Sequence, residues 1–197
     1  MRILIIVLIL LFYSLPTNVT GEEGWRPWDT KYSSWGCMLD THFEQSSDES
    51  TFLVYVSFGR LTDKEAYLRS DHQDVLQKDF ARNVVQEGDL TLMVTYVPNH
   101  FFDGSSVLPV DAVEIGGEEL RFTSQGLNND IQYFFDGEPT STNILKMFMQ
   151  GQNVEFILRY ENGKVRKFIY SRGKDVGFSV NFAQFQACIQ VLSDIEK

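Results

Sequence analysis

Residues 51–58 read TFLVYVSF, a run dominated by apolar, β-branched and aromatic side chains. Such side chains fit the pleated, half-buried surface of a β-strand. Residues 89–97 (DLTLMVTYV) repeat the pattern before Pro98, and turn residues stand between the runs. Alternating runs that end at turn signals are typical of antiparallel β structure. The sequence therefore predicts a mainly β protein with residues 51–58 as a central strand.

Short turn dipeptides predict where the later strands reverse direction. Asn-Gly at 162–163 is the strongest of them, because both residues tolerate the positive φ of a tight hairpin. Gly-Gly at 116–117 and Asp-Gly at 136–137 are similar signals. The strands predicted around these turns are residues 112–115, 118–123, 130–135, 154–160 and 164–170.

Outside these hairpins the pattern is weaker. Residues 34–42 are predicted as the first strand and residues 65–70 as a shorter one, which makes at least eight strands in all. Two segments are predicted as loops because they are polar or mixed in character. These are residues 44–50 (EQSSDES) and residues 71–80.

Two segments have helical spacing instead. Ser141 or Thr142 is in position to cap a short helix that ends at Gly151. A second helix is predicted from near Asn181, where apolar residues recur at three- and four-residue steps: Phe182, Phe185, Ile189 and Leu192. The predicted fold is an antiparallel β-sandwich or barrel with a short internal helix and a C-terminal amphipathic helix.

Residues 1–21 have the pattern of a secretory signal peptide. Arg2 precedes an apolar run at residues 3–13, and small residues up to Gly21 form a cleavage site. A membrane-spanning helix needs about 20 apolar residues, and this run of 11 is much shorter. We therefore expect export to the periplasm or the exterior, and a mature chain, residues 22–197, that is a single β-rich domain and does not span the membrane.

Cys37 and Cys188 are the only cysteines. An even pair in an exported chain is a disulfide candidate, because the exterior is oxidising. Two buried free thiols are the alternative. A catalytic cysteine is the weaker interpretation, since no neighbouring histidine or cationic cluster would favour the thiolate.

Composition excludes one class of partner. The chain has 27 acidic and 17 basic residues, a formal net charge of −10. Nucleic-acid binding depends on clustered Lys and Arg that neutralise phosphates. We therefore expect no nucleic-acid partner.

The two ends of the mature chain share features with a known family. Trp35-Gly36-Cys37 lies on the predicted first strand, and Gly177-Phe178-Ser179-Val180 leads into the last helix, which contains Cys188. This arrangement resembles secreted or periplasmic proteins related to the bacterial invasion-associated locus B family. The resemblance implies a compact β-rich domain that acts as an envelope or secreted accessory protein without a known catalytic site.

Motifs for catalysis or metal binding are absent from the sequence. His42, His72 and His100 stand apart, without the spacing that sets metal ligands on one face. Residues 104–106 (GSS) lack the glycine two positions later that a serine nucleophile elbow has. No cofactor, metal or catalytic residue is therefore predicted, although a spatial site of a secreted hydrolase is left open as a third interpretation.

Aromatic content suggests a binding function. The chain has 16 Phe, 8 Tyr and 3 Trp, and aromatic side chains anchor many interfaces. Those near turns form the candidate binding surface, with burial in the core as the alternative: Trp25, Trp28, Phe101, Phe102, Phe134 and Phe135. The preferred function is a non-enzymatic envelope or secreted protein that binds a protein or another envelope component. The alternative is a lipocalin-like carrier of a small apolar ligand.

Overall fold

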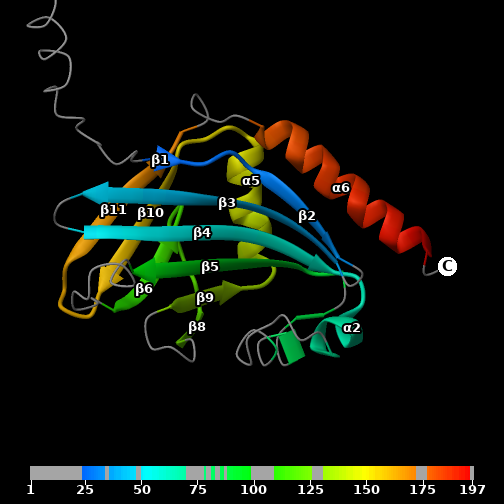
Figure 1. Ribbon diagram of the computed structural model, residues 1–197, viewed down its shortest axis with the longest axis horizontal. Helices are drawn as coiled ribbons and strands as arrows, with labels where there is room; N and C mark the ends of the chain where they lie inside the picture. Colours follow the sequence, from blue (N-terminus) through cyan, green and yellow to red (C-terminus); the bar gives the residue numbers. More distant parts are fainter. Residues whose placement is uncertain are drawn as a thin grey trace, which may run out of the picture.

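The computed structural model describes residues 24–33, 36–47, 50–69, 78, 81–82, 85–86, 88–98, 109–125, 131–171 and 177–195. In these residues eleven strands form two antiparallel sheets (Figure 1). The seven-stranded sheet contains β1 (Gly24–Trp25), β2 (Asp29–Ser33), β3 (Gly36–Ser47), β4 (Ser50–Leu61), β5 (Leu90–Pro98), β8 (Phe122–Gln125) and β9 (Gln132–Asp136). The four-stranded sheet contains β6 (Val110–Ile115), β7 (Glu118–Glu119), β10 (Val154–Tyr160) and β11 (Val165–Tyr170). The helices are α2 (Lys64–Arg69), α5 (Thr140–Met149) and α6 (Phe178–Ile195).

The predicted central strand is central. Strand β4 pairs with β3 along one edge and with β5 along the other, and the order across the sheet is β1-β3-β4-β5-β9-β8. Because β4 occupies one whole edge of β3, the short strands β1 and β2 both pair with its other edge. Strand β2 is therefore an edge strand, and this position decides which surface it helps to form.

The two sheets pack face to face through aromatic rings. Phe43 of the larger sheet stacks on Phe168 of the smaller one, with ring centroids 4.4 Å apart. Helix α5 closes one end of this core, where Phe148 lies 5.3 Å from the Trp28 ring and 4.8 Å from the Tyr170 ring. One continuous apolar cluster thus joins both sheets and α5. The predicted mainly β architecture with an internal and a C-terminal helix is confirmed.

Side-chain hydrogen bonds link the two sheets at two places, one at the β1 edge and one between β9 and β6. The Trp25 indole donates to the carbonyl of Ile169 over 3.1 Å, which links the β1 edge to β11. On the other side the buried Gln132 amide accepts from the Val110 N–H over 2.6 Å and donates to the Val110 carbonyl over 2.9 Å. The Gln132 side chain makes the two hydrogen bonds that the backbone of a neighbouring strand would make, and so satisfies two buried backbone groups at once.

Two of the three predicted hairpins are present, and one of these is divided; Asp136-Gly137 instead leads from β9 into α5. Strands β10 and β11 pair across Asn162-Gly163, and β6 and β7 pair across Gly116-Gly117. The predicted strand at residues 118–123 is not continuous: after β7 the chain crosses at Leu120 to the other sheet, where β8 pairs with β9. Leu120 lies between the two strands in sequence, and its side chain is buried in the core at this crossing.

Three local predictions were wrong. Residues 65–70 are not a strand, since Asp63 accepts from the Ala66 N–H over 2.8 Å and caps helix α2. Most of the predicted loop at residues 44–50 is paired strand, because the β3–β4 ladder continues to Ser47 and Ser50. Neither Ser141 nor Thr142 caps α5: the cap position is Pro139, without a side-chain hydrogen bond. The other predicted loop, residues 71–80, lies almost wholly outside the described residues.

Candidate functional site

The predicted disulfide is present. Cys37 of β3 is bonded to Cys188 of α6, with 6.2 Å between their Cα atoms. The first turn of α6 has a second attachment at Asn181, whose amide donates to the Trp28 carbonyl over 2.8 Å. Thr30 of β2 in turn donates to the Asn181 carbonyl over 2.8 Å. Two separate points therefore hold α6 against β2 and β3.

Three of the four predicted surface aromatics that the structure describes are buried. Trp28, Phe134 and Phe135 are 3%, 0% and 4% exposed. On β9, Phe134 lies opposite the buried Val94 and Phe135 opposite Met93, so the two rings lie on opposite faces of the sheet and both faces are covered there. Trp25 is half-buried against Phe156, with ring centroids 4.8 Å apart. Phe101 and Phe102 lie outside the described residues. The four placed aromatics do not form an exposed binding surface.

The space between the sheets is filled. The largest fully buried side chains include Phe52, Phe58, Phe148 and Phe156, and the Phe156 and Phe168 rings stack with centroids 5.2 Å apart. A carrier of the lipocalin type holds its ligand in the space inside its barrel. In the described part of the chain that space is occupied by side chains of the protein itself.

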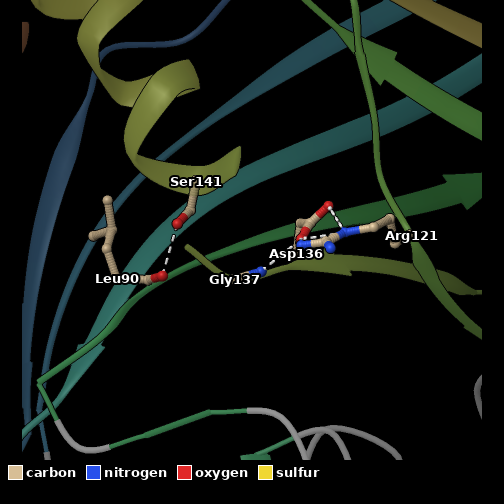
Figure 2. Close-up of polar contacts among 5 residues, drawn as sticks. All are labelled: Leu90, Arg121, Asp136, Gly137 and Ser141. Atoms are coloured by element: carbon tan, nitrogen blue, oxygen red, sulfur yellow. Dashed lines mark hydrogen bonds and ion pairs between the residues drawn. The ribbon is translucent and has the colours of Figure 1, made fainter. Parts of the chain in front are cut away.

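The buried polar cluster near α5 is structural (Figure 2). Asp136 is completely buried and accepts from Arg121 Nη2 over 2.6 Å and from the Gly137 N–H over 2.9 Å. Ser141 donates its hydroxyl proton to the Leu90 carbonyl over 2.7 Å. A nucleophilic serine instead donates that proton to a base, and here the hydrogen bond holds the β9–α5 turn against β5.

Burial shifts the pKa values of one histidine and three tyrosines among the described residues. Burial and the nearby Arg26 lower the pKa of His42, the one histidine that the structure describes. Burial raises the pKa of Tyr67 to about 12 and also raises the pKa values of Tyr96 and Tyr160. Within the described ranges, no three His, Cys, Asp or Glu side chains are grouped to hold a metal ion.

A cavity of about 380 Å³ lies between β2 and α6. Tyr32 and Ser33 line it from the end of β2, and Gln184, Ala187, Cys188 and Val191 line it from one face of α6. Its walls are mostly apolar, and Tyr32 and Val191 are 60% and 58% exposed at its rim. Among the described residues, none of those that line the cavity is charged.

The cavity is part of a longer exposed surface. One turn before Gln184 on the same face of α6, Val180 is 63% exposed. We call this set the α6–β2 surface: Tyr32, Ser33, Val180, Gln184, Ala187 and Val191. Three of the six large apolar side chains that are exposed in the described residues belong to it. An exposed apolar patch of this kind marks an interaction site more often than a scattered surface residue does.

Sequence reasoning located the helix and its cysteine but missed this surface. The available signal is an uncharged run, because residues 178–193 contain no Asp, Glu, Lys or Arg in a chain that is 22% charged. The outward residues of a helix on a globular domain are ordinarily charged or polar. Only the packing of Phe178 and Phe185 into the core shows which residues of the run face outward.

Comparison of the chain with protein-family models, with curated proteins and with solved structures finds no match. The resemblance to invasion-associated locus B proteins therefore stays a prediction. Among the helices of the described residues, none is both long enough and apolar enough to cross a membrane. What fold and site define is a disulfide-anchored antiparallel β-sandwich with an uncharged helical surface at one edge.

Proposed function

We propose that this protein is an exported, non-enzymatic envelope or secreted protein that binds another protein through the α6–β2 surface. The observation that supports this function is the exposed, uncharged and rigidly held outer face of α6. Residues 178–193 contain no charge, and the disulfide fixes the middle of the helix to β3. A preorganised surface binds with little loss of conformational entropy.

The chemistry of the surface favours a protein partner. Charged residues are depleted at the centres of protein interfaces, because burying a charge without a partner is costly. Val180, Ala187 and Val191 need no such compensation, and Gln184 and Tyr32 each combine apolar area with a polar end. The partner is expected to present an uncharged apolar segment of its own.

Export supports the same function. The leader pattern at residues 1–21 leads to an oxidising compartment, where a disulfide such as Cys37–Cys188 persists. A net charge of −10 also repels anionic lipid and nucleic acid. A protein or another envelope component is then the partner that composition favours.

Small-molecule carriage is the second candidate. The cavity of about 380 Å³ beside Cys188 supports it, since ligand pockets begin at about 300 Å³. The cavity is open at its rim, where Tyr32 and Val191 are more than half exposed. A ligand there would remain partly in water, which favours a protein side chain over a carried apolar molecule.

Site-specific photo-cross-linking in the source cell tests the function. A photoreactive residue replaces Gln184 on the surface, and in a matched control it replaces Lys164, which is exposed in the β10–β11 turn. We expect a defined cross-linked protein from position 184 only, and its loss in a Val180→Asp background. Equal products from both positions, or products that survive Val180→Asp, contradict the proposal.

A further inference from the structure

The exposed residues of α6 form a stripe with a specific spacing. Val180, Gln184, Ala187 and Val191 follow one another at steps of four, three and four residues. At about 100° per residue these steps keep all four on one side of the helix, turned away from the buried Phe178 and Phe185. Steps of four and three residues are the spacing of the seam between two packed helices.

The stripe is also nearly symmetric about its own centre. Its midpoint lies between Phe185 and Gln186, with valines at both ends and Gln184 and Ala187 on either side. An antiparallel second helix of the same sequence would place its Val191 over Val180 and its small Ala187 over the longer Gln184. A surface that is complementary to itself in this way forms an isologous contact about a twofold axis.

Resting on the proposed function of the α6–β2 surface, we propose that its partner is a second copy of this chain, bound by antiparallel packing of α6 on α6. Charge supports this partner. Two copies with a net charge of −10 each repel one another, so they are expected to meet where neither has a charge. The stripe satisfies this condition along its whole length.

Two of the three other exposed large apolar residues of the described chain do not satisfy it. Val165 and Ile169 of β11 are 50% and 53% exposed, but they lie on a face with the Lys167–Glu155 ion pair. The Arg159–Glu114 ion pair lies on the same sheet. Contact between two copies there would remove water from paired charges, which lowers the gain from burying the valine and isoleucine.

Position leaves room for a second helix. Figure 1 shows α6 along one corner of the sandwich, with its C-terminal turns extending beyond the ends of the strands. On the described chain α6 contacts chiefly β2 and β3. The disulfide and the Asn181 hydrogen bonds keep the helix in place while its outer side stays open.

The area predicts a weak dimer. From Val180 to Val191 the stripe is about 17 Å long. With a contact width of about 10 Å the stripe covers about 170 Å². With the ring of Tyr32 beside it, each copy would bury about 300 Å², less than half of the roughly 800 Å² per partner of a standard interface. The dimer should therefore depend strongly on protein concentration.

Sedimentation velocity of the exported, bridged protein tests the inference over concentrations from about 1 to about 500 µM. We expect a reversible monomer–dimer equilibrium. Ala187→Glu buries a carboxylate against the uncharged Gln184 of the second copy, one in each half of the contact, and should raise the dissociation constant at least about tenfold. Gln186→Glu adds the same charge to the same helix outside the stripe, and should leave the constant unchanged. Circular dichroism and a free-thiol assay show that both variants are folded and bridged.

A charge pair tests the antiparallel direction. Val180→Glu alone should weaken the dimer, and the double variant Val180→Glu/Val191→Lys should restore it, because each new carboxylate then faces a new ammonium group of the second copy. A parallel pair would place like charges together and stay weak. Restoration supports the antiparallel geometry, and its absence overturns it.

A chain that stays monomeric at all concentrations overturns the inference, and so does a dimer that tolerates Ala187→Glu. The cross-link from position 184 separates this failure from that of the proposed function. A cross-link to a different protein, with a monomeric chain, refutes the second copy and leaves the function standing. A chain that neither dimerises nor gives a cross-link from position 184 refutes the second copy and the proposed function together.

Discussion

At the scale of single residues, buried polar side chains join parts that the strand ladders leave apart. Gln132 connects β9 to β6, and Asp136 holds the turn before α5 through Arg121. Each is nearly or completely buried, so each contact replaces water that the folded chain excludes. Such residues are few, and the removal of one should affect the whole sandwich.

Gln132→Leu should lower the free energy of unfolding by about 2–4 kcal/mol. It leaves the buried N–H and carbonyl of Val110 without partners, at about 1–3 kcal/mol each. Gln152→Leu is the matched control, because Gln152 is exposed and contacts only Gln150 through its side chain. Urea denaturation measures both. Equal urea midpoints for the two variants would refute the role of Gln132 in linking the two sheets.

His42 should make the protein less stable in mild acid. Burial and Arg26 lower its pKa below the ordinary value of 6.5, so the unfolded chain binds a proton at a higher pH than the folded one. The stability that the neutral His42 contributes to the folded chain is complete above pH 6.5, and it is lost as the pH decreases toward the folded pKa.

Urea midpoints at about pH 7.5 and about pH 5.5 check this dependence. We expect His42→Gln to lose less stability than the native chain between the two pH values. His42→Gln also loses the contact with the Tyr55 ring, 5.0 Å away. Because the variant lacks this contact at both pH values, its loss cancels when the two changes in stability are compared. Identical pH dependence in the two proteins would contradict the assignment.

At the scale of elements, α6 and the β6–β7 hairpin are each held to the rest of the protein by a few specific contacts. Helix α6 touches the sandwich along one side only, and its attachments are the disulfide and the hydrogen bonds of Asn181. The β6–β7 hairpin instead rests on α5, where Gly116 lies against Met147.

Replacing the disulfide with Cys37→Ala/Cys188→Ala should destabilise the protein by up to about 5 kcal/mol on the chain-entropy model, because the bridge closes a loop between residues 151 apart in sequence. Amide exchange should rise most in α6. Reductant added to the native chain should reproduce the effect and leave the double variant unchanged. Uniform exchange in both forms would show that the bridge does not anchor the helix.

Gly116→Ala should destabilise more than Gly117→Ala. Both glycines have positive φ, +60° and +88°, so both substitutions share the backbone strain. A Cβ at Gly116 would also collide with the Met147 side chain, whereas one at Gly117 meets nothing within 4 Å. The colliding atoms are the flexible end of the Met147 side chain, which can shift, so the extra cost should lie near the lower end of the range for overpacking, about 1 kcal/mol. Thermal unfolding measures the difference, which a Met147→Ala background should reduce; an unchanged difference there would exclude the clash.

At the scale of the whole molecule, two sheets and two helices enclose one aromatic core. The core continues from Trp28 at the α5 end to Phe52 and Tyr96 at the other. Because the rings fill the interior of the described sandwich, we expect a binding surface on its outside. The uncharged edge at α6 is the part of that outside which differs most from an ordinary solvated surface.

Native mass spectrometry of the chain exported with its own leader should show a bare mature protein. We expect loss of residues 1–21, a mass lower by the two hydrogens of a disulfide, and no apolar adduct, since aromatic side chains fill the space between the sheets in the described part of the chain. A stoichiometric small-molecule adduct would instead favour the carrier. A retained leader would contradict export with cleavage.

Local sequence determined the elements whose signals lie within a few residues. Alternation set β4, β5 and β10, Asn-Gly and Gly-Gly set two hairpins, and three- and four-residue steps set α6. The pairing of Cys37 with Cys188 also followed from the sequence, because only two cysteines were available. These features need no information about distant segments.

Only the tertiary structure decided the rest. Pairing with β4 extended β3 through polar residues, and packing of the chain turned Phe134 and Phe135 into core residues. The α6–β2 surface appeared only after α6 lay beside the end of β2, far away in sequence. The physical reason is that a local pattern specifies the conformation of a segment, whereas exposure depends on which distant segments cover it.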